Sequence, residues 1–90
     1  MVTDFTFSGW CWGEMDDYDF EAKICSKGSP RGINYGHIVK LFVYDKKSSE
    51  EVAVYQQGWD TYPKTEEVLF STAQIVSCLE KLAKSKKRKT

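Results

Sequence analysis

The residue types that could carry out catalysis are a single histidine, His37, and three cysteines, Cys11, Cys25 and Cys78. A thiol activated by the imidazole, with a carboxylate such as Asp60 orienting the ring, would make a small hydrolase. The spacing of these residues does not support a triad, because triads are defined by geometry and not by sequence distance. A hydrolase using the His37/Asp60 region is therefore the last of the alternatives, and we predict a protein that is not an enzyme and has no catalytic residues.

The segment SPRGINYGHI, residues 29–38, is a candidate ligand loop, with glycines at Gly28, Gly32 and Gly36. Glycine-rich loops that cradle phosphate run from a strand into a helix, whereas this one connects two predicted strands. We therefore predict a connection in which Gly32 and Gly36 adopt positive φ at two bends. The loop could still bind a nucleotide or nucleic acid through its polar side chains, which are Arg31, Asn34, Tyr35 and His37.

Metal binding is not predicted from the acidic or sulfur-bearing residues. The acidic run Glu14, Asp16, Asp17, Asp19 and Glu21 could hold Mg²⁺ or act in acid–base catalysis. Its alternation beside a turn is more typical of a solvated sheet edge that deters strand addition. Three widely spaced cysteines form neither a disulfide framework nor a zinc site, and they fit a reducing cytosol. We expect no metal and no cofactor.

The charge of the chain is divided between its body and its C-terminus. The net charge is zero, yet residues 84–90, KSKKRKT, hold five of the 13 basic residues, which leaves eight basic against 13 acidic residues elsewhere. We predict a single domain over residues 1–83 followed by a basic, disordered tail over residues 84–90. Nucleic acid could bind this tail, through Lys84, Lys86, Lys87, Arg88 and Lys89.

The hydrophobic pattern predicts four strands followed by one helix. Strands are expected over residues 3–15, with a bend at Gly9, and over residues 18–25, 37–45 and 51–57, each rich in aromatic or β-branched residues. From Thr65, a plausible N-cap, the apolar period becomes helical. The predicted fold is α+β: a four-stranded antiparallel β-meander with one C-terminal amphipathic helix packed on one face (ββββα).

One helix can cover only one face of such a sheet, so we expect the other face to carry the binding site. Apolar side chains on both faces of the third and fourth strands predict a patch of Ile38, Phe42, Tyr44 and Tyr55. Trp59, in the segment QQGWD, is a further candidate for a contact surface. A patch of this kind is suited to a protein partner or to a homodimer, so we expect the protein to be a homo-oligomer.

The segments FEAKI, SPRGINYGHIVKL and VYQQGWD resemble a group of small uncharacterised proteins of phages and mobile elements. That group shows the pattern F-x-A-K, G-I-x-x-G-x-I-x-K-L and G-W-D before a terminal helix, and the match runs from residue 10 to about residue 82. The resemblance brings no activity. It implies a phage- or element-borne accessory protein inside a bacterial cell. We therefore expect an accessory or counter-defence protein in the cytoplasm of a bacterial host cell that contacts a host or phage protein through its exposed sheet face. No stretch approaches the roughly 20 apolar residues that a membrane span needs.

The tail separates the protein-contact function from the nucleic-acid alternative. If nucleic acid binds through the cations of residues 84–90, deleting those residues should abolish binding, and the full chain should lose affinity steeply as salt rises. Fluorescence anisotropy of labelled single-stranded DNA at two salt concentrations measures both effects. Affinity that persists at high salt without the tail would argue against the protein-contact function.

Overall fold

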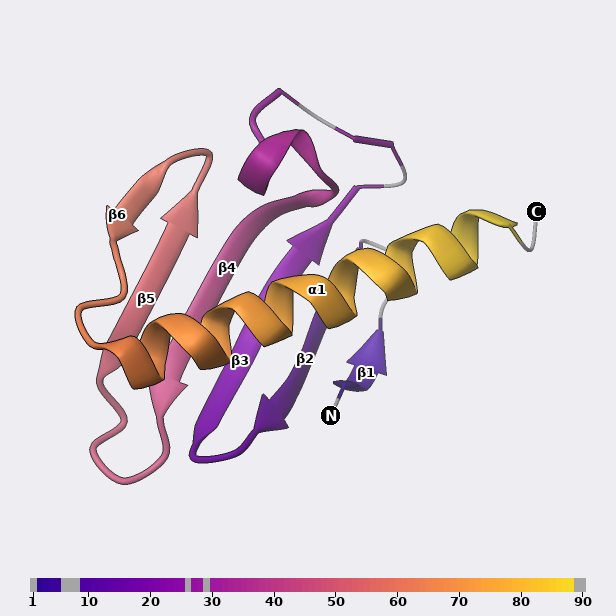
Figure 1. Cartoon of the computed structure of the whole chain (residues 1–90). Helices are drawn as coiled ribbons and strands as arrows, with labels where there is room; N and C mark the ends of the chain where they lie inside the picture. Colours follow the sequence, from indigo (N-terminus) through magenta and orange to yellow (C-terminus); the bar gives the residue numbers. More distant parts are fainter. Residues whose placement is uncertain (1, 6–8, 26, 29, 89–90) are drawn as a thin grey trace.

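The computed structural model describes residues 2–5, 9–25, 27–28 and 30–88 of the chain. It describes the side chains of these residues, except those of residues 2–5, 34 and 84–88. Within this part, strands β1 to β6 form one antiparallel sheet in sequence order, and the helix crosses one face of it (Figure 1). The elements are β1 Val2–Phe5, β2 Trp10–Met15, β3 Tyr18–Ile24, the short 3-10 helix η1 Ile33–Tyr35, β4 Ile38–Asp45, β5 Glu51–Gln56, β6 Trp59–Thr61 and α1 Glu66–Arg88. The predicted α+β class is confirmed.

The prediction of four strands is wrong in number. The expected first strand is two strands, β1 and β2, separated at Gly9, whose φ of 89° is accessible to glycine without strain. The bend expected at this residue is thus confirmed. The segment after Gly58, expected to be irregular, forms the short strand β6 against β5. The acidic run had been predicted to form a solvated edge of the sheet. This prediction is wrong, because β1 pairs with β2 and the hairpin of β2 and β3 is not the edge.

The core lies between α1 and one face of the sheet. Strand β3 alternates as expected, with Tyr18, Phe20, Ala22 and Ile24 all buried beneath the helix. The neighbouring strands contribute Cys11, Ile38, Leu41, Val43, Ala53 and Tyr55 to the same core. Burying a side chain of leucine or phenylalanine size stabilises a fold by roughly 1.5–3 kcal/mol, so this face accounts for most of the stabilisation.

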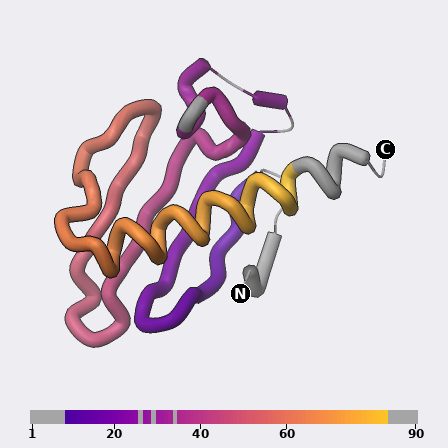
Figure 2. The backbone as a smooth tube through the Cα atoms, viewed as in Figure 1, coloured from indigo at the N-terminus to yellow at the C-terminus, as the bar shows by residue number. Residues whose placement is uncertain are grey.

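Helix α1 begins as the sequence predicts. The Thr65 hydroxyl accepts a hydrogen bond from the Val68 backbone N–H at 3.2 Å, which satisfies one free donor of the first turn. The helix lies across the strands at a steep angle (Figure 2) and buries Val68, Ile75 and Leu79. It runs to Arg88 and so includes the first residues of the segment 84–90. The division into a 1–83 domain and a tail stays a prediction.

The expectation that Gly32 and Gly36 adopt positive φ is wrong, since their φ angles are −81° and −92°. Positive φ occurs instead at Tyr35, at 60°. Both glycines are required for space: a Cβ on Gly32 would overlap the Gly36 carbonyl, and a Cβ on Gly36 would overlap the carboxylate of Glu80. The loop is therefore folded closely on itself and against the helix.

Glu80 of α1 joins the loop to the helix. Its Oε2 accepts a hydrogen bond from the His37 backbone N–H at 2.7 Å, and its Oε1 lies 2.6 Å from His37 Nδ1. The His37 carbonyl in turn accepts a hydrogen bond from the Cys25 N–H at 2.8 Å, at the junction of β3 and the loop. One carboxylate thus fixes the point at which the loop enters β4.

Replacing Glu80 by alanine should lower the free energy of unfolding by about 2–3 kcal/mol, because two hydrogen bonds to a charged group are lost and the buried His37 N–H is left unpaired. Urea denaturation followed by circular dichroism measures this difference. Gln74→Ala, on the exposed side of the same helix, is the matched control and should change stability by less than about 0.5 kcal/mol. Equal effects of the two variants would contradict the role given to Glu80.

Candidate functional site

The face of the sheet opposite α1 has no element of the described chain over it. The strand register aligns Trp12, Glu21, Phe42 and Val54 side by side across β2, β3, β4 and β5. Trp12 is 40% exposed and Phe42 is half-buried, whereas Val54 is buried. This row forms a strip on the open face in which Glu21 interrupts the apolar side chains, and its most exposed member is the indole ring of Trp12.

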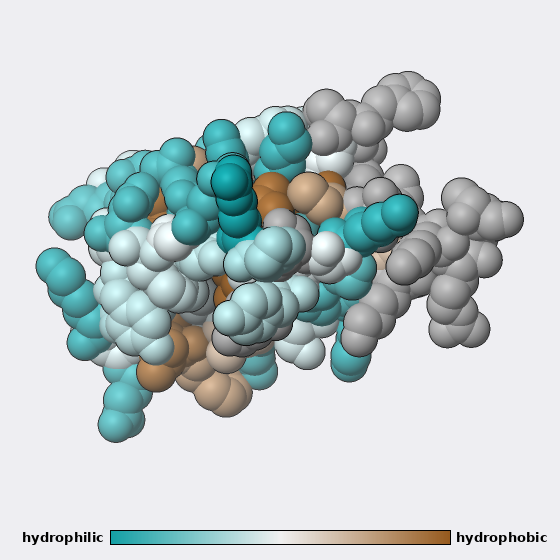
Figure 3. Space-filling view, turned by 90° about the horizontal axis from the view of Figure 1, so that it is seen from above, coloured by the Kyte–Doolittle hydropathy of each residue, from teal (hydrophilic) through white to brown (hydrophobic). Residues whose placement is uncertain are grey.

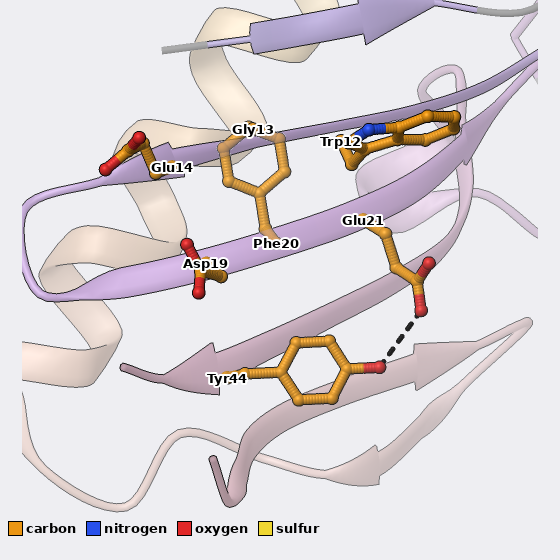
Figure 4. A pocket seen from close by; sticks show the side chains of 7 residues that line it. All are labelled: Trp12, Gly13, Glu14, Asp19, Phe20, Glu21 and Tyr44. Carbon is orange, nitrogen blue, oxygen red and sulfur yellow. Dashed lines mark hydrogen bonds between the residues drawn. The ribbon is translucent and has the colours of Figure 1, made fainter. Parts of the chain in front are cut away.

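A shallow hollow of about 660 Å³ lies beside this strip (Figure 4). Trp12 stands at one end of the hollow, and carboxylates from β2 and β3 project along it, with Tyr44 of β4 on the far side. The carboxylates are those of Glu14, Asp19 and Glu21. The hollow therefore combines one exposed aromatic ring with a cluster of negative charge.

Two polar pairs fix the side chains of this face. The Tyr44 hydroxyl donates to Glu21 Oε1 at 3.0 Å, and burial together with this bond raises the pKa of Tyr44 to about 12. The Lys46 ammonium is paired with the carboxylate of Glu14, which lowers the pKa of that carboxyl group. The bond to Glu21 and the Glu14–Lys46 pair hold these side chains in place on the open face.

Of the four residues predicted for the open face, Phe42 and Tyr44 lie there, and Ile38 and Tyr55 do not. Tyr55 pairs with Leu41 and so faces the helix, where it is 7% exposed and donates a hydrogen bond to the Arg31 carbonyl at 2.7 Å. Ile38 is fully buried because the pairing shifts between Lys23 and Ile24. These two assignments are wrong, since a bulge and the strand register, not parity alone, decide the face.

The loop residues predicted as polar contacts are dispersed. Arg31 Nη1 donates to Gln57 Oε1 at 3.4 Å, whereas Tyr35 is 78% exposed at the surface. His37 is bound to Glu80, and the side chain of Asn34 lies outside the described ones. The structure therefore does not gather this set into one site.

The G-W-D segment lies at the other end of the sheet from the Trp12 hollow. Trp59 makes edge-to-face contacts with Tyr55 and Tyr62, at centroid distances of 5.1 and 5.2 Å. Asp60 accepts a hydrogen bond from Gln56 Nε2 at 2.9 Å. Asp60 and His37 thus have different hydrogen-bond partners, Gln56 and Glu80.

The cysteines of the described chain are free thiols. Cys11 is buried in the core, and this burial raises the pKa of its thiol to about 11, so it acts there as a small apolar side chain. The described residues contain no cluster of three or more histidine, cysteine or acidic side chains arranged to hold a metal ion. None of the helices in the described part is long and apolar enough to cross a membrane.

Comparison with known proteins adds a family but no activity. A family model described as a domain of unknown function, DUF7678, matches residues 9–80. The chain belongs to this family. The matched range of the DUF7678 domain takes in the open face, the loop and most of α1. Neither the curated proteins nor the solved structures contain a match.

Sequence reasoning missed two residues that line the hollow. Trp12 was not among the predicted binding residues, and Glu21 was assigned only to a solvated acidic run. A usable signal was present. Trp12, Glu21 and Phe42 alternate along their strands with Cys11, Ala22 and Leu41, so they point to the other face of the sheet. Aligning these parities required the register, which the sequence does not give.

The raised pKa of Tyr44 predicts a stability loss at high pH. The phenol ionises near its ordinary value of 10 in the unfolded chain and near 12 in the folded one. The contribution of Tyr44 to the free energy of unfolding is therefore complete below pH 10 and is lost as the pH rises through 12. Urea midpoints between pH 9 and 12 should fall less steeply in Tyr44→Phe. Glu21→Gln should lower the pKa of Tyr44, seen in a phenolate titration at alkaline pH; an unchanged titration would contradict the assigned bond.

Proposed function

We propose that this DUF7678 protein is a non-catalytic binding protein that contacts a partner protein through the open face of its sheet. The observation that carries the proposal is the exposed Trp12 ring beside half-buried Phe42 and Tyr44, on a face that α1 does not cover. Tryptophan and tyrosine are enriched among residues that dominate binding energy at protein interfaces. A rigid sheet presents such rings with little loss of conformational entropy on binding.

The charges of the hollow indicate the chemistry of the partner. Glu14, Asp19 and Glu21 line it, and an arginine or lysine of a partner would find both carboxylates and the face of an indole there. A partner with a basic surface that also carries an apolar contact suits this arrangement best. Association should accordingly slow as ionic strength rises.

The accessory or counter-defence role in a bacterial host cell belongs to this proposal as its biological context. It is supported by the resemblance to small phage and mobile-element proteins, and membership of an uncharacterised family is consistent with it. In this context the partner is a host or phage protein.

Nucleic-acid binding is the less favoured function for the same face. Sheet surfaces that stack single-stranded nucleic acid combine aromatic rings with a basic groove that follows the phosphates. Here three carboxylates line the hollow beside Trp12. They would repel a phosphate backbone, so the tail would have to supply the binding.

Trp12→Ala tests the proposal. Truncating a central ring of an interface should raise the dissociation constant for a protein captured from bacterial lysate, and then purified, by a factor of 30 or more, corresponding to about 2 kcal/mol. Isothermal titration calorimetry measures the change. Tyr35→Ala is the matched control, because Tyr35 is equally aromatic and exposed but lies in the loop. If Tyr35→Ala weakens binding and Trp12→Ala does not, the open face is not the contact surface.

A further inference from the structure

A second surface lies on the helix side of the molecule, away from the open face. An apolar groove of about 300 Å³ runs between α1 and the segments η1 and β6. One wall is formed by Ile33, Trp59, Tyr62 and Pro63, and the other by helix residues Leu69, Thr72, Ala73, Val76 and Ser77. The groove therefore lies where the loop and the G-W-D segment meet the helix.

Exposed apolar side chains gather around this groove. Of the six large hydrophobic residues that are exposed in the described chain, four lie here, and Phe70 is 64% exposed. The four are Trp59, Tyr62, Leu69 and Phe70. Figure 3 shows the molecule from above, so the helix side, which faces the viewer in Figure 1, is at its lower margin. Brown apolar atoms reach the surface there. A contiguous patch of this kind marks an interaction surface rather than scattered surface residues.

The helix presents a second apolar stripe to this surface. Leu69, Ala73 and Ser77 are spaced by four residues each and are exposed, so they share a side of the helix at the margin of the buried stripe. Val76, which packs against the core, lies between this side and the sheet. The small residues Ala73 and Ser77 lie in the middle, where a second helix could approach closely. Nearby, the Thr72 hydroxyl is buried and has no hydrogen-bond partner among the described groups, which indicates that the packing here is incomplete.

We propose that this surface binds a second copy of the chain, with the two α1 helices packed antiparallel around a two-fold axis near Ala73 and Ser77. A two-fold interface requires one surface that is complementary to itself. This surface carries both a projecting ring, Phe70, and an apolar groove beside it. In the dimer, the partner's helix covers Phe70 of each copy.

The charges along α1 decide the orientation. Its first turn carries Glu66 and Glu67, whereas Lys81 is exposed toward the other end and the sequence of residues 84–88 is basic. Antiparallel packing places the acidic end of each helix beside the basic end of the other. It also aligns the helix dipoles favourably, whereas parallel packing would bring like charges together.

The dimer surface is thus distinct from the partner-binding face. The sequence had indicated self-association through the sheet, whereas this proposal assigns it to the helix side and leaves Trp12 and its hollow accessible. It does not depend on the proposed function, because the two surfaces lie on opposite layers of the molecule.

Phe70→Glu in the full chain tests the proposal. Sedimentation equilibrium should show a reversible dimer for the unaltered protein and a dissociation constant raised about tenfold or more for the variant, with an unchanged circular dichroism spectrum because Phe70 is exposed. Tyr35→Glu, at an exposed aromatic outside the patch, is the matched control and should dimerise normally. A monomer at all concentrations, or equal dimerisation of both variants, would overturn the proposal. Loss of the dimer in Trp12→Ala would assign self-association to the sheet face instead.

A disulfide tests the antiparallel geometry. In a Cys25→Ser, Cys78→Ser background, Ser77→Cys lies near the proposed axis and should form a cross-linked dimer under mild oxidation. Tyr35→Cys, exposed in the loop outside the patch, is the control and should cross-link at least tenfold more slowly. Adding Phe70→Glu should suppress the Ser77→Cys cross-link. Equal cross-linking at both positions would mean random collision and would contradict the proposed packing.

Discussion

A single helix can cover only one face of a sheet, and the rest of this structure follows from that constraint. The core is confined to the layer between α1 and the helix-facing side chains of the strands, among them Leu41, Val43 and Ile75. The part of the chain that the structure describes contains no second α-helix that could cover the opposite face. The side chains there must therefore be compatible with water, and they are a mixture of acids, lysines and aromatic rings.

The helix is held in place at both ends of its buried stripe. Near its start, the Tyr18 hydroxyl of β3 donates to Glu67 at 2.7 Å, which raises the pKa of that phenol to about 12. Toward its end, Glu80 accepts hydrogen bonds from His37 and so also orders the loop that leads into β4. These polar contacts are partly buried, and they fix the rotation of a helix whose apolar contacts alone are not directional.

That rotation creates the apolar surface on the helix side. With Val68, Ile75 and Leu79 turned to the sheet, Leu69 faces outward beside β6 and Phe70 is exposed next to it. The aromatic contacts among Tyr55, Trp59 and Tyr62 extend the apolar wall from the core to the surface at this point. The molecule thus has an acidic, aromatic hollow on one layer and an apolar groove on the other, so the proposed partner protein and the proposed second copy of the chain would use different surfaces.

The sequence by itself determined the fold class, the alternation of β3, the helix with its Thr65 cap and the bend at Gly9, because each depends on neighbouring residues. It did not determine how the strands pair. The bulge that buries Ile38 and the register that places Tyr55 opposite Leu41 arise from contacts between distant segments, and shifting a strand by one residue reverses the face of every side chain. The tertiary structure alone therefore decided that Trp12 joins Phe42 and Tyr44 on the open face, that Ile38 and Tyr55 do not, and that Glu80 fills the space left by Gly36.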